Sequence, residues 1–186
     1  PYVIKTKKEE IVFDTDEYPN RKTNLEKLGT LRPAFVKDGS VTAGNASGIN
    51  DGAAFFLVAS EEAVKENGLT PVVEIVSVGQ GGVDPQVMGL GPVPAIRMAL
   101  KNAGMKLEDI DIIELNEAFA SQSLGVIHEL VEEHGVTKEW ILERTNVTGG
   151  AIALGHPVGA SGARIIVTLI HNMLKSGKKL GLASLC

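Results

Sequence analysis

A single histidine stands in a glycine-rich run that could place its imidazole at a reactive site. The run is GGAIALGHPVGASGARI, residues 149–165, and its five glycines are too many for a plain helix or strand. Glycine allows close approach of backbone or ligand, and Gly155 and Pro157 hold the backbone of His156 in a turn. No cysteine or second histidine stands at metal-ligand spacing from it. We therefore predict a functional imidazole and no metal site.

Two further side chains with chemical potential follow predicted strands. Asn116 comes directly after the apolar stretch DIIEL and precedes a helical pattern. It could cap that helix, or it could orient a water or a substrate carbonyl at the carboxyl edge of the sheet, and the residues alone leave both open. Cys186 ends the apolar run LGLASLC, a pattern typical of an inert packing cysteine.

Strands and helices alternate along most of the chain, and the apolar runs are continuous rather than alternating. Such runs are typical of strands that are buried on both faces. The pattern predicts an α/β fold with a layered sheet covered by helices. We expect strands at 53–59, 72–79, 109–115 and 180–186, helices at 61–67, 91–104, 116–135, 137–145 and 160–177, and, before these, a hairpin within 2–15 and a short helix ending before Pro33. The histidines within predicted helices are expected to be structural: His128, His134 and His171.

The composition limits the classes of function. A net charge of −5 argues against a protein that binds the phosphate backbone of nucleic acids. No stretch approaches the roughly 18 apolar residues of a membrane span, and no signal peptide opens the chain. One cysteine rules out an internal disulfide and is typical of the reducing cytoplasm. Because the chain begins at Pro1 and stops at Cys186 directly after an apolar run, we expect a fragment.

Together, these stretches resemble the thiolase family. The matching motifs keep the family's order over nearly the whole chain, and the histidine block is the most specific of them: TAGNASGINDGAA, VMGLGPVPA, IIELNEAFA, NVTGGAIALGHPVGASGARI and GLASLC. Within the family, the resemblance is to the branch that acts on acetyl and acetoacetyl groups. The chain departs from the usual pattern in NVTGG for NVNGG, in a longer segment before that motif, and in lacking the glycine-rich turn that normally follows the cysteine.

The resemblance implies an architecture about twice the size of this chain. Thiolases have two similar α/β halves in an αβαβα layering, plus a loop domain that contributes to coenzyme A binding. Residues 1–42 would be the tail of that loop domain. Residues 43–69 would be the last strand and helix of the N-terminal half, and residues 70–186 the C-terminal half, truncated at its end.

The resemblance also implies a reaction, the reversible Claisen condensation of two acetyl-CoA to acetoacetyl-CoA through an acyl-cysteine intermediate. The nucleophilic cysteine would lie in the missing N-terminal half. His156 would help to activate it and, with a water held by Asn116, would form an oxyanion hole. Cys186 would be the base that removes the α-proton of the second acetyl-CoA.

Family contacts to the substrate map onto five further positions. Ser47 and Ala46 would face the pantetheine arm, and Met88 and Phe119 would wall a space that admits only an acetyl group. Arg21 would face the coenzyme's phosphates or simply be solvated.

The expected partners follow from the same resemblance. They are acetyl-CoA and acetoacetyl-CoA as substrates with no further cofactor, the remaining N-terminal half, and a homotetramer without nucleic acid or membrane. The isolated chain would then be inactive. The alternatives are a non-catalytic acyl-CoA-binding module and a longer-chain 3-ketoacyl-CoA thiolase. A ketoacyl synthase is disfavoured, because those enzymes show a different set of histidine and lysine residues.

Overall fold

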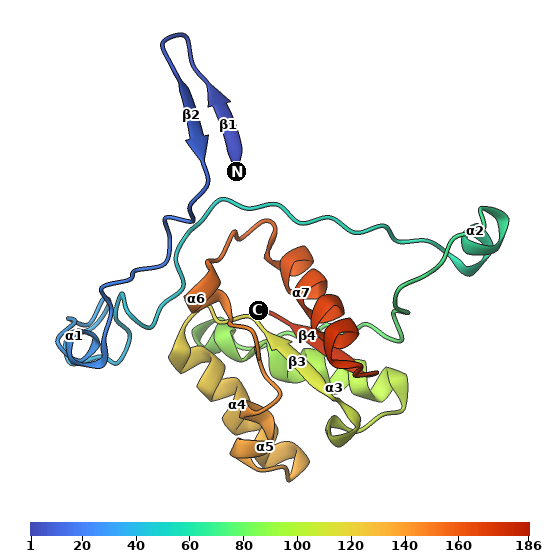
Figure 1. Ribbon diagram of the computed structural model, residues 1–186. Coiled ribbons are helices and arrows are strands. Elements are labelled where there is room, and N and C mark those ends of the chain that lie inside the picture. Colours follow the sequence, from blue (N-terminus) through green and yellow to red (C-terminus); the bar gives the residue numbers. More distant parts are fainter. The chain divides into compact units, whose positions relative to one another are not determined.

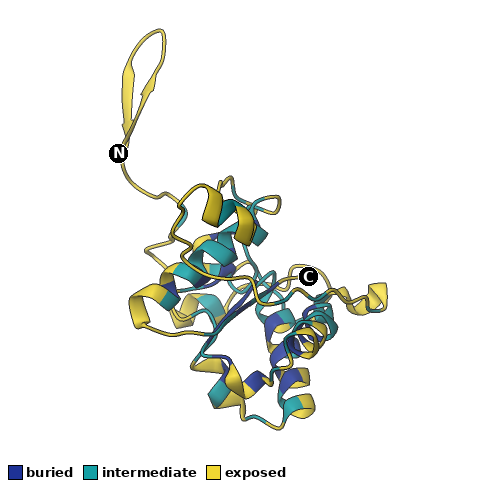
Figure 2. Ribbon diagram, turned by 90° about the vertical axis from the view of Figure 1, so that its right-hand side faces the viewer, coloured by how far each residue is buried: buried dark blue, intermediate teal, exposed yellow.

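The computed structural model describes residues 1–186 and divides them into two compact units, Pro1–Leu31 and Arg32–Cys186. In the first unit, strands β1 (Tyr2–Lys5) and β2 (Glu10–Phe13) form an antiparallel hairpin, which is exposed throughout (Figure 2). Helix α1 (Leu25–Gly29) follows, capped by the side chain of Asn24. The predicted hairpin and short helix are confirmed.

The second unit contains a packed α/β body in which two parallel strands lie between helices (Figure 1). Its principal elements are α3 (Pro92–Ala103), β3 (Ile112–Leu115), α4 (Ala120–His134), α5 (Lys138–Leu142), α7 (Ser161–Ser176) and β4 (Gly181–Ser184). Shorter elements are α2 (Glu61–Glu66), α6 (Ala151–Leu154) and the 3₁₀ turns η1 (Pro85–Leu90) and η2 (Leu107–Asp109). The predicted α/β class is confirmed.

The sheet of this body is covered on both faces, which explains its continuous apolar runs. Ile113 and Leu115 of β3 belong to the core formed with α3, α4 and α5. Glu114, between them, points to the other face, where its carboxylate accepts a hydrogen bond from Asn172 of α7. Side chains alternate between the two faces of a strand. Since helices cover both faces here, every residue of β3 is buried.

The helix ends follow local chemistry and agree with the predictions. Helices α3, α4 and α7 each end at a glycine in the left-handed conformation, where a side chain would be strained: Gly104, Gly135 and Gly177. Ser60 caps α2 through a hydrogen bond from the backbone N–H of Ala63. No helix has the length and apolar character needed to cross a membrane.

Two predicted strands, at 53–59 and 72–79, are wrong. Both segments are without regular secondary structure and are largely exposed. Segment 72–79 lies along α3, where Ser77 donates to the carbonyl of Ala99 and Asn102 donates to the carbonyl of Val78. Neither segment has a neighbouring strand to bond, and an apolar, β-branched sequence cannot form a ladder alone.

The structure differs from the predicted helices at two places, the start of one helix and an additional helical turn. Helix α4 begins at Ala120, with Phe119 at the N-cap position, so Asn116 neither opens nor caps it. Within the glycine-rich run, a single helical turn, α6, forms before Gly155. Residues 116–119 are thereby left as a loop at the end of β3, which frees the Asn116 side chain for other contacts.

Candidate active site

The candidate site forms at the carboxyl ends of β3 and β4. These strands run parallel, with Leu115 opposite Ser184, and the backbone N–H of Asn116 donates to the carbonyl of Ser184 at 3.0 Å. Asn116 is buried with 2% of its surface exposed. In layered α/β proteins this edge is where ligands bind.

The backbone of His156 is held by a segment more than a hundred residues away in sequence. Its N–H donates to the carbonyl of Gly48 at 3.1 Å and to the side-chain oxygen of Asn50 at 3.2 Å. Gly155 has φ +97°, and a Cβ there would lie 2.7 Å from Asn50 Oδ1. Only glycine fits at this position, which explains the residue in front of the histidine.

Both ring nitrogens of His156 have a neighbour. Nε2 lies 3.5 Å from Asn116 Nδ2, and Nδ1 lies 2.6 Å from Ser161 Oγ. Ser161 Oγ in turn donates to the carbonyl of Pro157 at 3.1 Å. The imidazole is thus fixed at both ends, and its Nε2 edge faces the buried amide.

One charged side chain, that of Arg164, acts on the imidazole of His156. Burial lowers the pKa of His156, and the nearby guanidinium of Arg164 lowers it further. Arg164 Nη1 lies 3.9 Å from Glu114 Oε2. Burial raises the pKa of Glu114 to about 7, against the opposing effects of Arg164 and of the hydrogen bond from Asn172. For His156, burial and the Arg164 guanidinium both favour the neutral form of the imidazole.

The loop after β3 is tied to the glycine-rich segment around residue 47. Ser47 donates to the carbonyl of Ala118 through both its N–H and its hydroxyl, each at 3.0 Å, and Ala46 bridges Phe119. Two of the residues predicted to bind substrate thus lie against the loop that carries Asn116. The Ser47 hydroxyl, however, is already used within the protein.

The remaining predicted residues are more scattered. Cys186 is an exposed free thiol two residues beyond β4, and no hydrogen bond joins it to His156 or Asn116. It lies close to Gly91, where a Cβ would be 3.7 Å from the cysteine Cβ. Met88 is exposed in η1, and Phe119 makes an edge-to-face contact with Phe35. Arg21 belongs to the first unit.

Sequence reasoning missed four residues. Asn50 and Ser161 bond to the backbone and the ring of His156, Arg164 lowers the pKa of the ring, and Glu114 lies beside Arg164. Glu114 carried a readable signal, because a lone carboxylate in an apolar strand must find polar partners once buried. Ser161 and Arg164 stand in the same motif as His156, but nothing in their spacing indicates contact with the ring. Asn50 could not be found from the sequence, since its contact depends on chain packing.

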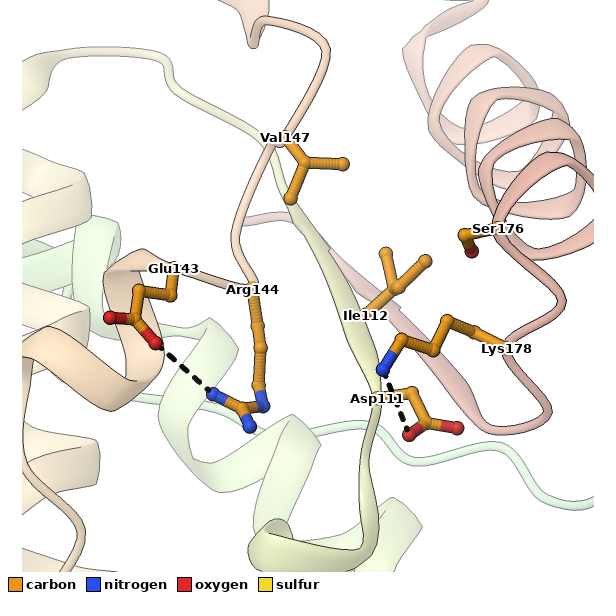
Figure 3. A pocket seen from close by; sticks show the side chains of 7 residues that line it. All are labelled: Asp111, Ile112, Glu143, Arg144, Val147, Ser176 and Lys178. Carbon is orange, nitrogen blue, oxygen red and sulfur yellow. Dashed lines mark ion pairs between the residues drawn. The ribbon is translucent and has the colours of Figure 1, made fainter.

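A pocket lies at the opposite, amino end of β3 (Figure 3). Figure 3 shows Asp111 paired with Lys178 and Arg144 paired with Glu143. Asp111 also accepts hydrogen bonds from the backbone N–H groups of Lys179 and Leu180, which lower its pKa. These groups satisfy one another, and none of the predicted site residues lines the pocket. No group of three or more histidine, cysteine or acidic residues is placed to hold a metal ion.

Comparison with family models matches almost the entire chain. The model described as "Thiolase, N-terminal domain" matches residues 1–62, and "Thiolase, C-terminal domain" matches residues 69–186. The chain belongs to the thiolase family. The predicted family and fold are confirmed. Asn116, His156 and Cys186 lie within the match to the C-terminal domain, and the segment 46–50, which bonds to His156 and to the loop that carries Asn116, lies within the match to the N-terminal domain.

Named relatives narrow the similarity within the thiolases. The chain is 57% identical over its whole length to an acetyl-CoA acetyltransferase of Syntrophomonas wolfei and 54% identical to that of Escherichia coli K12, covering 45% of each relative. The crystal structure of the Bacillus anthracis acetyl-CoA acetyltransferase matches 99% of this thiolase chain with a TM-score of 0.87 and 49% identity. Human mitochondrial 3-ketoacyl-CoA thiolase matches with a TM-score of 0.80 and 44% identity. The chain spans less than half the length of these proteins, 45% in each case.

Proposed function

We propose that this chain is part of an acetyl-CoA acetyltransferase that condenses two acetyl-CoA molecules to acetoacetyl-CoA and coenzyme A, and catalyses the reverse cleavage. The observation that carries the proposal is the distance of 3.5 Å between the buried amide of Asn116 and His156 Nε2. Asn116 follows β3 and Cys186 follows β4, and these two strands are paired. The names of the relatives support the choice of reaction.

In this proposal His156 serves in both half-reactions. Its neutral Nε2 accepts the proton of the nucleophilic cysteine, and the resulting thiolate attacks the carbonyl carbon of the acetyl thioester. The bond from that carbon to the coenzyme A sulfur then breaks, which leaves acetyl-cysteine, and coenzyme A departs as its thiol with the proton of Cys186. The protonated ring afterwards donates a hydrogen bond to the oxygen on which negative charge develops. Because Cys186 is the one cysteine of this chain, the rest of the enzyme must supply the nucleophile.

Asn116 contributes the second donor to the same oxygen by way of water. Its Oδ1 is buried and has no hydrogen-bond partner within the protein. A water that donates one proton to Oδ1 keeps its other proton for the substrate oxygen. Asn116 Oδ1 and the substrate oxygen then each accept a hydrogen bond. The loop 116–119 fixes this amide, since Ser47 and Ala46 bind the loop from the other side.

Cys186 is the proposed base of the condensation step. As thiolate it removes a proton from the methyl group of the second acetyl-CoA, and the resulting carbanion attacks the acetyl-cysteine carbonyl. The nucleophilic cysteine then leaves as its thiolate. Cys186 follows β4, which pairs with β3, and so belongs to the edge that carries Asn116.

The length of the acyl group that the enzyme accepts distinguishes the proposed function from the first alternative, a longer-chain thiolase. Met88 and Phe119 are proposed to limit the acyl group to acetyl, whereas a longer-chain 3-ketoacyl-CoA thiolase would leave more room, and the human mitochondrial enzyme of that name shares the fold. A non-catalytic acyl-CoA-binding module is the second alternative. It needs neither His156 nor Cys186, so it leaves their presence unexplained.

The wider setting belongs to the proposal as well. Residues 1–42 are assigned to the coenzyme-binding loop domain, 43–69 to the end of the N-terminal half and 70–186 to the C-terminal half, and the junction of the two family models between 62 and 69 supports this division. Arg21 is proposed to face the coenzyme's phosphates. The whole enzyme is proposed to be a cytoplasmic homotetramer of fatty acid metabolism that needs only coenzyme A thioesters.

The Asn116→Ala variant of the whole enzyme tests this proposal. Loss of an oxyanion-hole donor costs about 10²–10³ in rate, and we expect that fall in kcat for the thiolysis of acetoacetyl-CoA. The Asn67→Ala variant, which changes an exposed asparagine after α2, should keep full activity. A change of less than tenfold in Asn116→Ala would refute the role, and a wild-type enzyme that binds acetyl-CoA without turnover would support the non-catalytic module.

A further inference from the structure

The hydroxyl of Ser161 does not cap the helix in which it lies. Ser161 is the first residue of α7, yet no side-chain hydrogen bond caps this helix. The residue is fully buried. A buried hydroxyl requires partners, and those of Ser161 are His156 Nδ1 at 2.6 Å and the carbonyl of Pro157 at 3.1 Å.

The two partners together determine which ring nitrogen carries the proton. A carbonyl oxygen can only accept, so the single hydroxyl proton of Ser161 goes to Pro157. The hydroxyl oxygen must then accept from the ring, which requires a proton on His156 Nδ1. In a neutral imidazole the other nitrogen is unprotonated.

The opposite edge of the ring leads to the same assignment. The group nearest to His156 Nε2 is the amide nitrogen of Asn116, which is a donor. A second donor on Nε2 would leave two N–H groups facing each other, whereas an unprotonated Nε2 accepts the amide hydrogen. The network therefore runs in one direction, from Asn116 through His156 and Ser161 to the carbonyl of Pro157.

The charged group that acts on the His156 ring is Arg164, and the carboxylates of Glu114 and Glu117 act on Arg164 in turn. Arg164 is on α7, Glu114 is on β3, and Glu117 is in the loop after β3, where its carboxylate accepts from Asn146 and from the backbone of Ile152. The pKa of His156 is lowered mainly by burial and then by Arg164. A neutral ring exists as one of two tautomers, so the choice between them falls to the hydrogen bonds.

We propose that Ser161 is a positioning residue that holds His156 as the Nδ1–H tautomer, leaving Nε2 as the nitrogen that accepts a proton. The inference extends the proposed function, because that reaction needs an unprotonated Nε2 at its start. The hydroxyl of Ser161 bonds to His156 and to the carbonyl of Pro157. It acts through the imidazole alone.

Nitrogen NMR of the ring tests this tautomer directly. The whole enzyme is labelled with ¹⁵N-histidine, and the His156 signals are assigned by their loss in His156→Gln. We expect a protonated Nδ1 and an unprotonated Nε2 at pH 7.5. The opposite pattern, with the proton on Nε2, would overturn the proposal while leaving the acetyl-transfer function intact, since the measurement does not depend on turnover.

The Ser161→Ala variant provides the kinetic test. We expect its ring to populate both tautomers and its kcat to fall about tenfold, the effect of one hydrogen bond, with KM for acetyl-CoA changed less than about twofold. Ser161→Thr, which keeps the hydroxyl, should restore the wild-type ring spectrum and most of the rate. Ser176→Ala removes a similar serine-to-carbonyl bond at the far end of α7 and should change neither.

An unchanged ring spectrum in Ser161→Ala would also overturn the proposal. If the wild-type enzyme shows no acetyl transfer but its ring carries the Nδ1 proton, the proposed function fails and the tautomer assignment stands. The two failures are therefore distinguishable.

Discussion

Segment 72–79 and strand β3 have similar sequences but different structures. VVEIVSVG and IIEL are both rich in β-branched and aliphatic residues, and each has one carboxylate. In β3 every residue is buried, and the strand pairs with β4 and packs against helices on both faces. In segment 72–79 most residues are exposed and none belongs to a strand.

The difference lies in the neighbours rather than in the residues. Backbone groups of a strand need a ladder partner, and apolar side chains stabilise it only where other side chains cover them. β3 has β4 and Thr145 beside it, whereas segment 72–79 has only α3. An apolar run thus specifies a potential strand, and the rest of the protein decides whether it forms.

The largest change in the free energy of unfolding is expected for a substitution in the core of the packed body around β3. Leu130 of α4 has 1% of its surface exposed, and its truncation leaves a cavity in the core. We expect Leu130→Ala to lower the free energy of unfolding by about 2–5 kcal/mol, measured by urea denaturation. Leu124→Ala, on the same helix but 48% exposed, should cost less than about 1 kcal/mol. Equal losses at both positions would contradict the assigned core.

The free energy of unfolding of the same packed body should also depend on pH, through the buried carboxyl of Glu114. The pKa of Glu114 is about 7 in the fold and near 4.5 otherwise, so the folded protein keeps a proton that the unfolded chain releases between these values. The free energy of unfolding should therefore fall by at most roughly 3 kcal/mol as pH rises from 4.5 through 7.

Chemical denaturation across this pH range measures the effect. Glu114→Gln cannot titrate, so the wild-type fall should be missing from its profile. Glu132→Gln, at an exposed position of α4, should retain it. A rise of stability with pH in the wild-type minus Glu114→Gln difference would show that the carboxylate is stabilised, rather than penalised, by its surroundings.

The smallest change in the free energy of unfolding is expected for a substitution in segment 72–79. Val76 is 55% exposed, so Val76→Ala should change the free energy of unfolding of this chain by less than about 0.5 kcal/mol. The same substitution at the buried Val126 should cost at least about 1 kcal/mol. In the whole enzyme, where further strands can cover the segment, Val76→Ala should approach the cost at Val126; if it remains neutral there, the segment is a surface connection in the complete protein too.

Much of the fold follows from local signals in the sequence. Gly104, Gly135 and Gly177 mark helix ends because only glycine adopts their conformation freely. Such rules act within a few residues and need no knowledge of tertiary contacts. They fail at Asn116, which has every property of a helix cap, because α4 begins four residues later.

The site was predictable only in part. The motifs indicated His156 and Asn116, and the structure brings the two into contact. Ser161 and Glu114 reach the ring's surroundings through packing between α7 and β3, which no spacing rule describes. The position of Cys186 relative to the ring remains a prediction.

The hydrogen bonds from the His156 backbone to Gly48 and Asn50 have a consequence for how the site assembles. The donor lies within the stretch matched by the thiolase C-terminal model, and both acceptors lie within the stretch matched by the N-terminal one. The C-terminal stretch alone supplies the neighbours of both ring nitrogens, Asn116 and Ser161, but not the acceptors that bind the backbone N–H of His156. We therefore expect the backbone of His156 to be fixed only once the two stretches have docked, so that before docking its imidazole would be held through the ring contacts alone.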